Sequence, residues 1–169
     1  MTGGATLVAM ALGVSAAALP LAIDVSPRFI WNASASVPIG LYAVKPASQL
    51  QLNDLVVVRT PEDVAAFLAE GDYLPRGVPI LKHILALAGQ SVCRFGRAVS
   101  VDAVAMGDAR ESDSHGRALP VWQGCRVVAQ GDVFLMNRSA DSFDGRYFGP
   151  LHAASIIGHA EPLWTEREE

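Results

Sequence analysis

The chain has 169 residues, of which 51% are hydrophobic, with a mean hydropathy of +0.29 and a formal net charge of -4. This length allows one compact domain preceded by an N-terminal segment. Lysine and arginine are scattered along the chain and form no basic stripe, which argues against nucleic acid as a partner.

The first predicted element is a membrane anchor. Residues 5–23 carry no charged side chain and as a helix would span about 28 Å, close to the thickness of a bilayer interior. A cleaved signal peptide is the alternative, but the first basic residue is Arg28, so the usual basic start of such a peptide is missing. We therefore expect an uncleaved anchor over residues 1–27, with a bend or an end near Pro20, and a soluble domain over residues 28–169.

Two serines follow the anchor within residues 32–42. Ser34 and Ser36 lie one residue apart and directly precede Pro38 and Gly40. Proline holds the residue before it in an extended conformation, and glycine permits a turn or a close backbone approach. Both serines are therefore expected on one rigid, extended lip that can present a hydroxyl to a substrate. A plain polar linker is the alternative interpretation of this stretch.

Short strands dominate the rest of the prediction. Apolar runs that are bounded by turn residues are typical of strands and hairpins. One short helix is predicted over residues 60–71, because Thr60-Pro61-Glu62-Asp63 is typical of a helix start. Together these elements indicate a mainly β, antiparallel fold with a short inserted helix. The predicted strands cover residues 41–44, 50–59, 79–88, 121–130 and 133–136, with a hairpin over residues 91–104.

Two polar segments interrupt the strands. Residues 106–116 are polar and charged, and we expect a mobile loop there. Residues 137–149 are punctuated by glycine, and we expect a loop that packs on the core through Phe143, Tyr147 and Phe148.

Lys82 is the one basic residue of the apolar run 79–88 and shares a strand face with Ile80 and Ile84. Desolvation among apolar neighbours lowers the pKa of a lysine amine towards neutrality, which would make it a base. Only a functional site sustains the cost of such burial. The alternative is a lysine at a strand edge whose ammonium group reaches water.

A serine nucleophile needs a base, and histidine is the usual one. His83 lies on the opposite strand face from Lys82, and none of the four histidines sits in a recognisable nucleophile motif. The chain also has no Gly-x-Ser-x-Gly, Ser-x-x-Lys or His-Glu-x-x-His. A Ser-His-Asp triad is therefore the weaker enzyme hypothesis. The histidines are His83, His115, His152 and His159.

Asp144 and Arg146 lie two residues apart in the segment 137–149 and can form a charge-assisted pair that fixes this loop. Ser142, just before them, could turn its hydroxyl towards a neighbouring base. An ordinary solvated turn is the alternative interpretation.

Cys93 and Cys125 are the only cysteines, and no Cys-x-x-Cys or histidine-rich pattern accompanies them, which makes a zinc site improbable. In an exported domain they would pair as a disulfide. Two unrelated buried thiols are the alternative.

Three blocks of the chain resemble motifs of the signal peptidase I family of Ser/Lys peptidases, and most closely its conjugative-transfer, TraF-type branch. Residues 36–42, Ser-Val-Pro-Ile-Gly-Leu-Tyr, are similar to that branch's Ser-Met-Pro-x-Gly-x-Tyr block. Residues 81–84, Leu-Lys-His-Ile, followed by Ala-Gly at 88–89, are similar to its lysine block. Residues 142–150 are similar to its terminal Ser-Phe-Asp-Ser-Arg-Tyr-Phe-Gly-Pro block. The order and the spacing agree, and the resemblance runs from the predicted anchor to Trp164.

The resemblance implies a role for each matching residue. Val37, His83 and Gly145 depart from the methionine, arginine and serine that are usual at these positions. The changes at Val37 and His83 bear on substrate preference more than on the chemistry. By this resemblance Ser36 is the nucleophile and Lys82 is its general base. Ser34 contributes to the oxyanion hole, and the Ser142 hydroxyl orients the lysine. Asp144 and Arg146 form a supporting ion pair.

The resemblance further implies a signal-peptidase-like β catalytic domain in the periplasm, held at the outer face of the cytoplasmic membrane, without a metal or an organic cofactor. The implied partners are signal-peptide-bearing precursors with small residues before the cut, typically conjugative pilins, which some members of the branch cyclise. A non-catalytic, membrane-anchored assembly or binding module is the alternative, and it would not need Lys82. A self-cleaving repressor of related fold would need a DNA-binding domain in place of the anchor.

Overall fold

The structure is a computed structural model that describes residues 3–22 and 27–166. The remaining residues of the predicted anchor (1–27) and of the predicted domain (28–169) lie outside the described residues.

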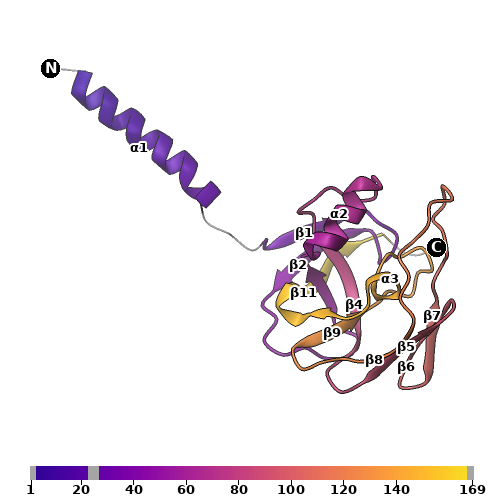
Figure 1. Ribbon diagram of the computed structural model, residues 1–169. Coiled ribbons are helices and arrows are strands. Elements are labelled where there is room, and N and C mark those ends of the chain that lie inside the picture. Colours follow the sequence, from indigo (N-terminus) through magenta and orange to yellow (C-terminus); the bar gives the residue numbers. More distant parts are fainter. Residues whose placement is uncertain (1–2, 23–26, 167–169) are drawn as a thin grey trace.

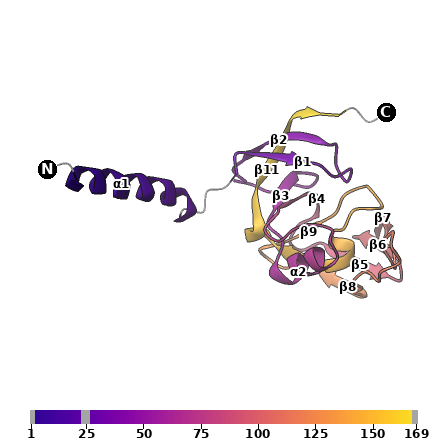
Figure 2. The same cartoon turned by 90° about the horizontal axis from the view of Figure 1, so that it is seen from above.

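Helix α1 (Gly3–Ala22) occupies the place of the predicted anchor, and Figures 1 and 2 show it extending away from the β domain. It ends two residues after Pro20, close to the predicted end. The side chains of residues 3–15 are exposed, among them Leu7 and Met10. Among the helices of the described residues, none combines the length and the apolar character that crossing a membrane requires. The helix itself is therefore present, whereas its predicted passage through the membrane is not confirmed.

The β domain consists of two antiparallel sheets within the described residues, in agreement with the predicted mainly β fold. The smaller sheet has four strands in the order β7 (Val104–Asp108), β6 (Ala98–Val101), β5 (Ser91–Phe95) and β8 (Gly124–Val127). The larger sheet has seven strands in the order β1 (Phe29–Asn32), β2 (Gly40–Lys45), β11 (Ile156–Thr165), β3 (Leu55–Val58), β4 (Ile80–Ala86), β9 (Asp132–Leu135) and β10 (Leu151–His152).

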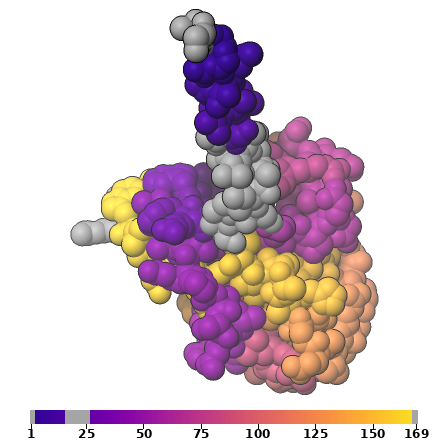
Figure 3. Space-filling view, turned by 90° about the vertical axis from the view of Figure 1, so that its left-hand side faces the viewer, coloured from indigo at the N-terminus to yellow at the C-terminus, as the bar shows by residue number. Residues whose placement is uncertain are grey.

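Strand β11 lies between β2 and β3, so the last strand of the chain separates two early ones. Figure 3 shows the yellow C-terminal surface beside the purple N-terminal part of the β domain. The sequence analysis does not predict this strand, because Gly158 and Pro162 within it are typical strand breakers. Both lie next to irregularities in the strand register, where the pairing tolerates them.

Helix α2 (Glu62–Glu70) is the predicted inserted helix, and it begins one residue later than expected, with Pro61 as its N-cap. Its buried face carries Val64, Ala65 and Leu68. Two short helical segments were not predicted: α3 (Gly145–Phe148), which lies inside the expected loop 137–149, and the 3-10 turn η1 (Ala153–Ser155).

The predicted loop 106–116 is less irregular than the sequence suggests. Strand β7 extends to Asp108, so the first residues of this segment pair with β6. Further along, Asp113 accepts hydrogen bonds from the backbone and the side chain of Arg117 and from the Tyr73 hydroxyl. The polar side chains of this segment therefore form hydrogen bonds with one another and with Tyr73, which follows α2.

Strand β4 contributes to every part of the apolar core. Leu81, Ile84 and Ala86 are buried, and each belongs to a different cluster of apolar side chains. Burial of a leucine or isoleucine side chain contributes about 1.5–3 kcal/mol to folding. Lys82 is buried in the same strand, so its position is fixed by packing on both sides. The predicted buried strand is confirmed.

Cys93 of β5 and Cys125 of β8 are directly opposite residues of the smaller sheet, and a disulfide joins them. This is the pairing expected of an exported domain. Figure 1 shows this sheet beside α3, the short helix that carries Arg146.

Candidate active site

Ser34 and Ser36 form one end of the candidate site. Their hydroxyl oxygens lie 3.0 Å apart and share a hydrogen bond. Ser34 is exposed and Ser36 is half-buried, while Val37, the next residue, is buried in the core. Val37 therefore anchors the predicted lip in the core, while the two serine hydroxyls remain accessible to solvent.

Asn32, which the sequence analysis does not single out, holds the serine lip in place. Its amide nitrogen donates to the carbonyl oxygens of Ser34, Val37 and Pro38 at 2.8, 3.0 and 3.1 Å, and its amide oxygen accepts from the backbone nitrogen and the hydroxyl of Ser34. The Tyr42 hydroxyl adds a bond to the Pro38 carbonyl at 2.6 Å. A buried side chain thus satisfies the polar backbone of the whole turn.

Lys82 lies at the other end of the site and is 5% exposed. Its amine donates to the Ser142 hydroxyl oxygen at 2.8 Å. Burial lowers the pKa of the Lys82 amine to about 8, against an opposing effect of the Asp144 carboxylate and with a smaller lowering by Arg146. Near neutral pH such an amine is a far better base than a surface lysine.

Asn137 fixes the backbone of β4 on both sides of Lys82. Its amide nitrogen donates to the Leu81 carbonyl at 3.0 Å, and its amide oxygen accepts from the His83 backbone nitrogen at 3.1 Å. The same oxygen lies 3.1 Å from Nδ1 of His83. Asn137 is 1% exposed, so these bonds are shielded from water. They lock the strand at the residue that carries the amine.

Asp144 and Arg146 form a fully buried ion pair with an N–O distance of 2.8 Å. Asp144 also accepts from the Asn137 backbone nitrogen and caps α3 at the Arg146 backbone nitrogen. The Arg146 guanidinium donates to four further carbonyls, those of Asp108, Asn137, Ser139 and Ser142. The predicted pair therefore exists, and through the Ser142 carbonyl it fixes the residue that binds Lys82.

Arg94 of β5 and Trp122, which lies just before β8, both donate hydrogen bonds to the backbone of α3. The guanidinium of Arg94, which is 1% exposed, donates to the Arg146 carbonyl at 2.5 Å. The indole nitrogen of Trp122 donates to the Gly145 carbonyl at 3.0 Å. A Cβ at Gly145 would lie 2.6 Å from the Leu135 carbonyl oxygen. Glycine in place of the family's usual serine is thus explained by close packing.

One cavity of about 310 Å³ is lined by four of the predicted site residues, whereas Asp144 and Arg146 lie behind its wall. We call it the serine cavity. Apolar side chains, including Leu68, Leu74, Ile80 and Phe143, line the rest of its wall. The arrangement offers a nucleophile, a base and orienting hydroxyls in a partly apolar hollow, which is the equipment for acyl transfer. The polar side chains on its wall include Ser34, Ser36, Lys82 and Ser142.

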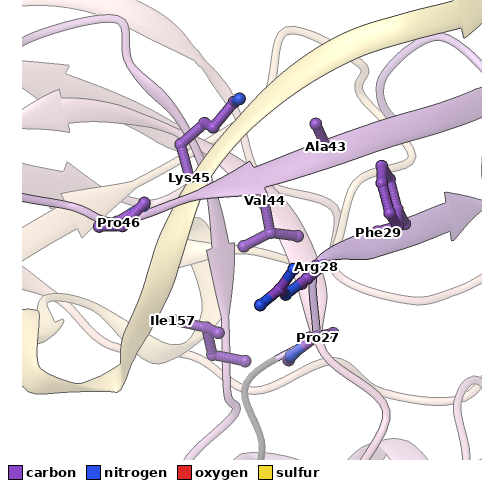
Figure 4. Close-up of a pocket in the computed structure, with 8 residues that line it drawn as sticks. All are labelled: Pro27, Arg28, Phe29, Ala43, Val44, Lys45, Pro46 and Ile157. Carbon is purple, nitrogen blue, oxygen red and sulfur yellow. The ribbon is translucent and has the colours of Figure 1, made fainter.

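The other features that the sequence raised lie elsewhere. Within the described residues, no histidine lines the serine cavity, which removes the basis of a Ser-His-Asp triad there. No group of histidine, cysteine and carboxylate side chains suited to a metal occurs in the described part of the chain. A separate hollow of about 460 Å³ lies beside β1 and β2. Figure 4 shows Val44, Arg28 and Ile157 facing this hollow, and no predicted site residue lines it.

The comparison with known families supports what this geometry indicates. The model of the family described as signal peptidase, peptidase S26, matches residues 4–164. The chain belongs to this family. Its three motif blocks, identified from the sequence, all lie inside the matched range.

Relatives of this S26 family chain carry names from DNA transfer. A conjugal transfer protein TraF of Agrobacterium fabrum (strain C58 / ATCC 33970) is 36% identical over 146 residues, which cover 79% of this chain and 81% of that protein. A plasmid transfer protein TraF of Escherichia coli is 30% identical over 145 residues, covering 79% and 81%. Among solved structures, a signal peptidase I from Enterococcus faecalis V583 matches 69% of this chain and 98% of that chain, with a TM-score of 0.40 and 17% identity.

Proposed function

We propose that this protein is a serine endopeptidase in which Ser36 is the nucleophile and Lys82 is the general base. The state of Lys82 carries the proposal: the amine is buried, its pKa is lowered to about 8, and it lines the same cavity as Ser36. A lysine that loses its proton near neutral pH can take the proton of a serine hydroxyl. Membership of a peptidase family supports the same reading.

In the proposed reaction, neutral Lys82 accepts the proton of the Ser36 hydroxyl while the serine oxygen forms a bond to the carbonyl carbon of the substrate. The Ser34 hydroxyl, 3.0 Å from that of Ser36, turns to donate to the oxyanion that develops. The protonated Lys82 then gives its proton to the leaving amine as the peptide bond breaks. The product of this half-reaction is an acyl group on Ser36 and a free amine.

The residues around Lys82 are proposed to orient it. Ser142 holds the amine at 2.8 Å, and Arg146 and Asp144 fix the backbone that carries Ser142. Asn137 fixes the strand that carries Lys82. Lys82 and Ser142 are therefore held by buried hydrogen bonds to neighbouring segments, which is the preorganisation that acyl transfer requires.

The proposed substrate is a signal-peptide-bearing precursor, cut after a small residue, and a conjugative pilin is the first choice. Relatives named conjugal transfer proteins support the biological setting. The volume of the serine cavity, about 310 Å³, is compatible with a short stretch of small side chains lying against Leu68 and Leu74. Hydrolysis of the acyl group gives a linear product. Transfer to an amine of the same chain gives a cyclic product, one water lighter, and intact-mass analysis separates the two.

The proposed location is the periplasm, at the outer face of the cytoplasmic membrane. A disulfide between Cys93 and Cys125 supports an oxidising compartment. The exposed apolar side chains of α1 support contact with a membrane. Alkaline extraction of membranes, compared for the full chain and a form lacking residues 1–27, tests this placement.

The test of the proposed function compares three alanine variants on one purified precursor. Ser36→Ala is expected to abolish cleavage. Ser34→Ala is expected to slow it by a factor corresponding to about 3–4 kcal/mol, the usual effect of losing one oxyanion donor. Ser48→Ala, on the exposed surface, serves as the control and should cleave normally. Unchanged cleavage by Ser36→Ala would refute Ser36 as the nucleophile. Absence of cleavage by the wild-type protein would favour the non-catalytic assembly module.

A further inference from the structure

We propose that a second cavity, which shares a wall with the serine cavity, binds an aromatic or large aliphatic side chain of the substrate on the leaving-group side of the cut. This inference rests on the proposed peptidase function. The second cavity has a volume of about 370 Å³. Only three residues of its lining, Ser142, Phe143 and Tyr147, belong to a motif block. The others are Tyr73 and residues of the segments 110–119 and 140–141.

The two cavities are direct neighbours. Tyr73, Asp141, Ser142 and Phe143 line both of them. Ser34, Ser36 and Lys82 line only the serine cavity. A substrate chain that passes Ser36 and continues beyond Ser142 therefore meets the second cavity next.

The position of the base indicates which part of the substrate the second cavity would bind. In acyl transfer the general base that activates the nucleophile also returns the proton to the leaving amine, so the leaving group lies on the side of the base. Here the base is bound to Ser142, at 2.8 Å, and Ser142 belongs to the shared wall. The second cavity thus lies on the side of the residues that follow the cut.

Three aromatic side chains, those of Tyr73, Phe143 and Tyr147, form part of the wall of the second cavity. Phe143 stacks on Tyr147 with ring centroids 5.1 Å apart and ring planes within 1° of parallel. Leu119, half-buried, completes the apolar part of the lining. Such surfaces favour flat or branched apolar side chains over small ones, because the larger side chain removes more apolar area from water.

The charged groups of the second cavity already have charged partners, either within its lining or just outside it. Arg110 forms an ion pair with Asp141 at 2.7 Å. Asp113 accepts from the Tyr73 hydroxyl and from Arg117. A charged substrate side chain would have to break one of these pairs, so the cavity selects against charge.

Hydrogen bonds hold this lining in place before a substrate arrives. The Arg110 backbone nitrogen donates to the Tyr147 hydroxyl at 3.0 Å, which fixes the loop to the aromatic wall. Tyr73 is fixed through Asp113 and by stacking on Phe67 at 5.8 Å. Binding a side chain here therefore requires little reordering of the protein, which favours selectivity.

The experiment uses the full chain and a set of precursors that differ only in the first or the second residue after the cut. At one of these positions, phenylalanine or leucine is expected to give a kcat/KM about tenfold or more above that of alanine, and aspartate should be worse still. Equal values for all four residues at both positions would overturn the inference while leaving the peptidase proposal intact.

A substitution that fills the second cavity tests its role directly. Leu119→Trp should remove the preference, by lowering kcat/KM for the phenylalanine precursor to about the value for the alanine precursor. Val121→Trp, two residues along and exposed outside the cavity, is the matched control and should keep the preference. Equal slowing of both precursors by Leu119→Trp would contradict the inference.

A third measurement separates misfolding and failure of the parent proposal from failure of this inference. A small serine-directed phosphonate has no residues on the leaving side, so its rate of labelling at Ser36 should be the same in wild type, Leu119→Trp and Val121→Trp. Loss of labelling only in Leu119→Trp would mean that the variant is misfolded, and Leu119→Phe then replaces it. Absence of labelling in the wild type would refute the peptidase proposal itself.

Discussion

The Lys82 amine and the Ser142 hydroxyl oxygen lie 2.8 Å apart, although the two residues are 60 positions apart in the chain. The bond joins the centre of β4 to the segment that precedes α3. It also means that the proposed base is already oriented before any substrate binds. The predictions below concern this amine and the residues that hold it.

Lys82→Arg is expected to be inactive although it keeps the positive charge. A guanidinium stays protonated at any accessible pH and cannot take the serine proton. The measurement is precursor cleavage by the purified variant, with Lys45→Arg on the exposed surface as the control. Activity in Lys82→Arg would point to a different base and would remove the central role of this residue.

The pH dependence of cleavage should follow the protonation of Lys82. Because burial lowers its pKa to about 8, the amine is protonated below that pH and becomes the active base above it. We therefore expect kcat/KM to rise through pH 7–9 with a midpoint of about 8, and to level off at higher pH. A profile that is flat over this range, or that falls with pH, would contradict the assignment of Lys82 as base.

Arg146→Met is expected to lower the free energy of unfolding of the protein. It leaves the Asp144 carboxylate buried without its charged partner, a loss of about 3–5 kcal/mol in the free energy of unfolding. Denaturant unfolding of the purified domain measures this loss. The comparison is Arg76→Met, whose ion pair with Glu62 is exposed and should be worth less than about 1 kcal/mol.

Removal of the disulfide by Cys93→Ser with Cys125→Ser is expected to lower the free energy of unfolding by about 3–4 kcal/mol, because the bond closes a long loop in the unfolded chain. Activity at low temperature should be retained if Arg94 and Trp122 still hold α3. Non-reducing peptide mapping of protein isolated from the periplasm checks the bond itself. Two free thiols in such protein would contradict both the bond and the proposed compartment.

Residues with unusual local chemistry could be found from the sequence. Lys82 stands out in an apolar run, and the serines stand out because proline and glycine follow them closely. The motif blocks then point to Ser142, Asp144 and Arg146, and the structure places Lys82, Ser142 and the serine lip on one cavity. The buried strand, the inserted helix and the mainly β fold follow from hydrophobic pattern and helix-start signals.

Residues that act through the backbone of distant segments could not be found in this way. Asn32 and Asn137 are ordinary polar residues in the sequence, and their importance comes from carbonyls that only the folded chain brings within reach. Arg94 lies in a predicted hairpin, where an arginine is usually a surface residue, yet it is 1% exposed. Strand β11 was missed because its local signals are those of a loop, and its partners β2 and β3 supply the missing stability.

The place of β11 between β2 and β3 has a consequence for when the protein can act. As the chain is synthesised from its N-terminus, β2 and β3 are made long before the strand that lies between them. The serine lip precedes β2 and Lys82 lies beyond β3 in the sheet, so the two halves of the site are held together only when residues 156–165 have arrived. Non-local pairing of this kind delays folding to the end of synthesis. The proposed nucleophile and the proposed base are therefore held in one sheet only after the last strand of the chain has paired.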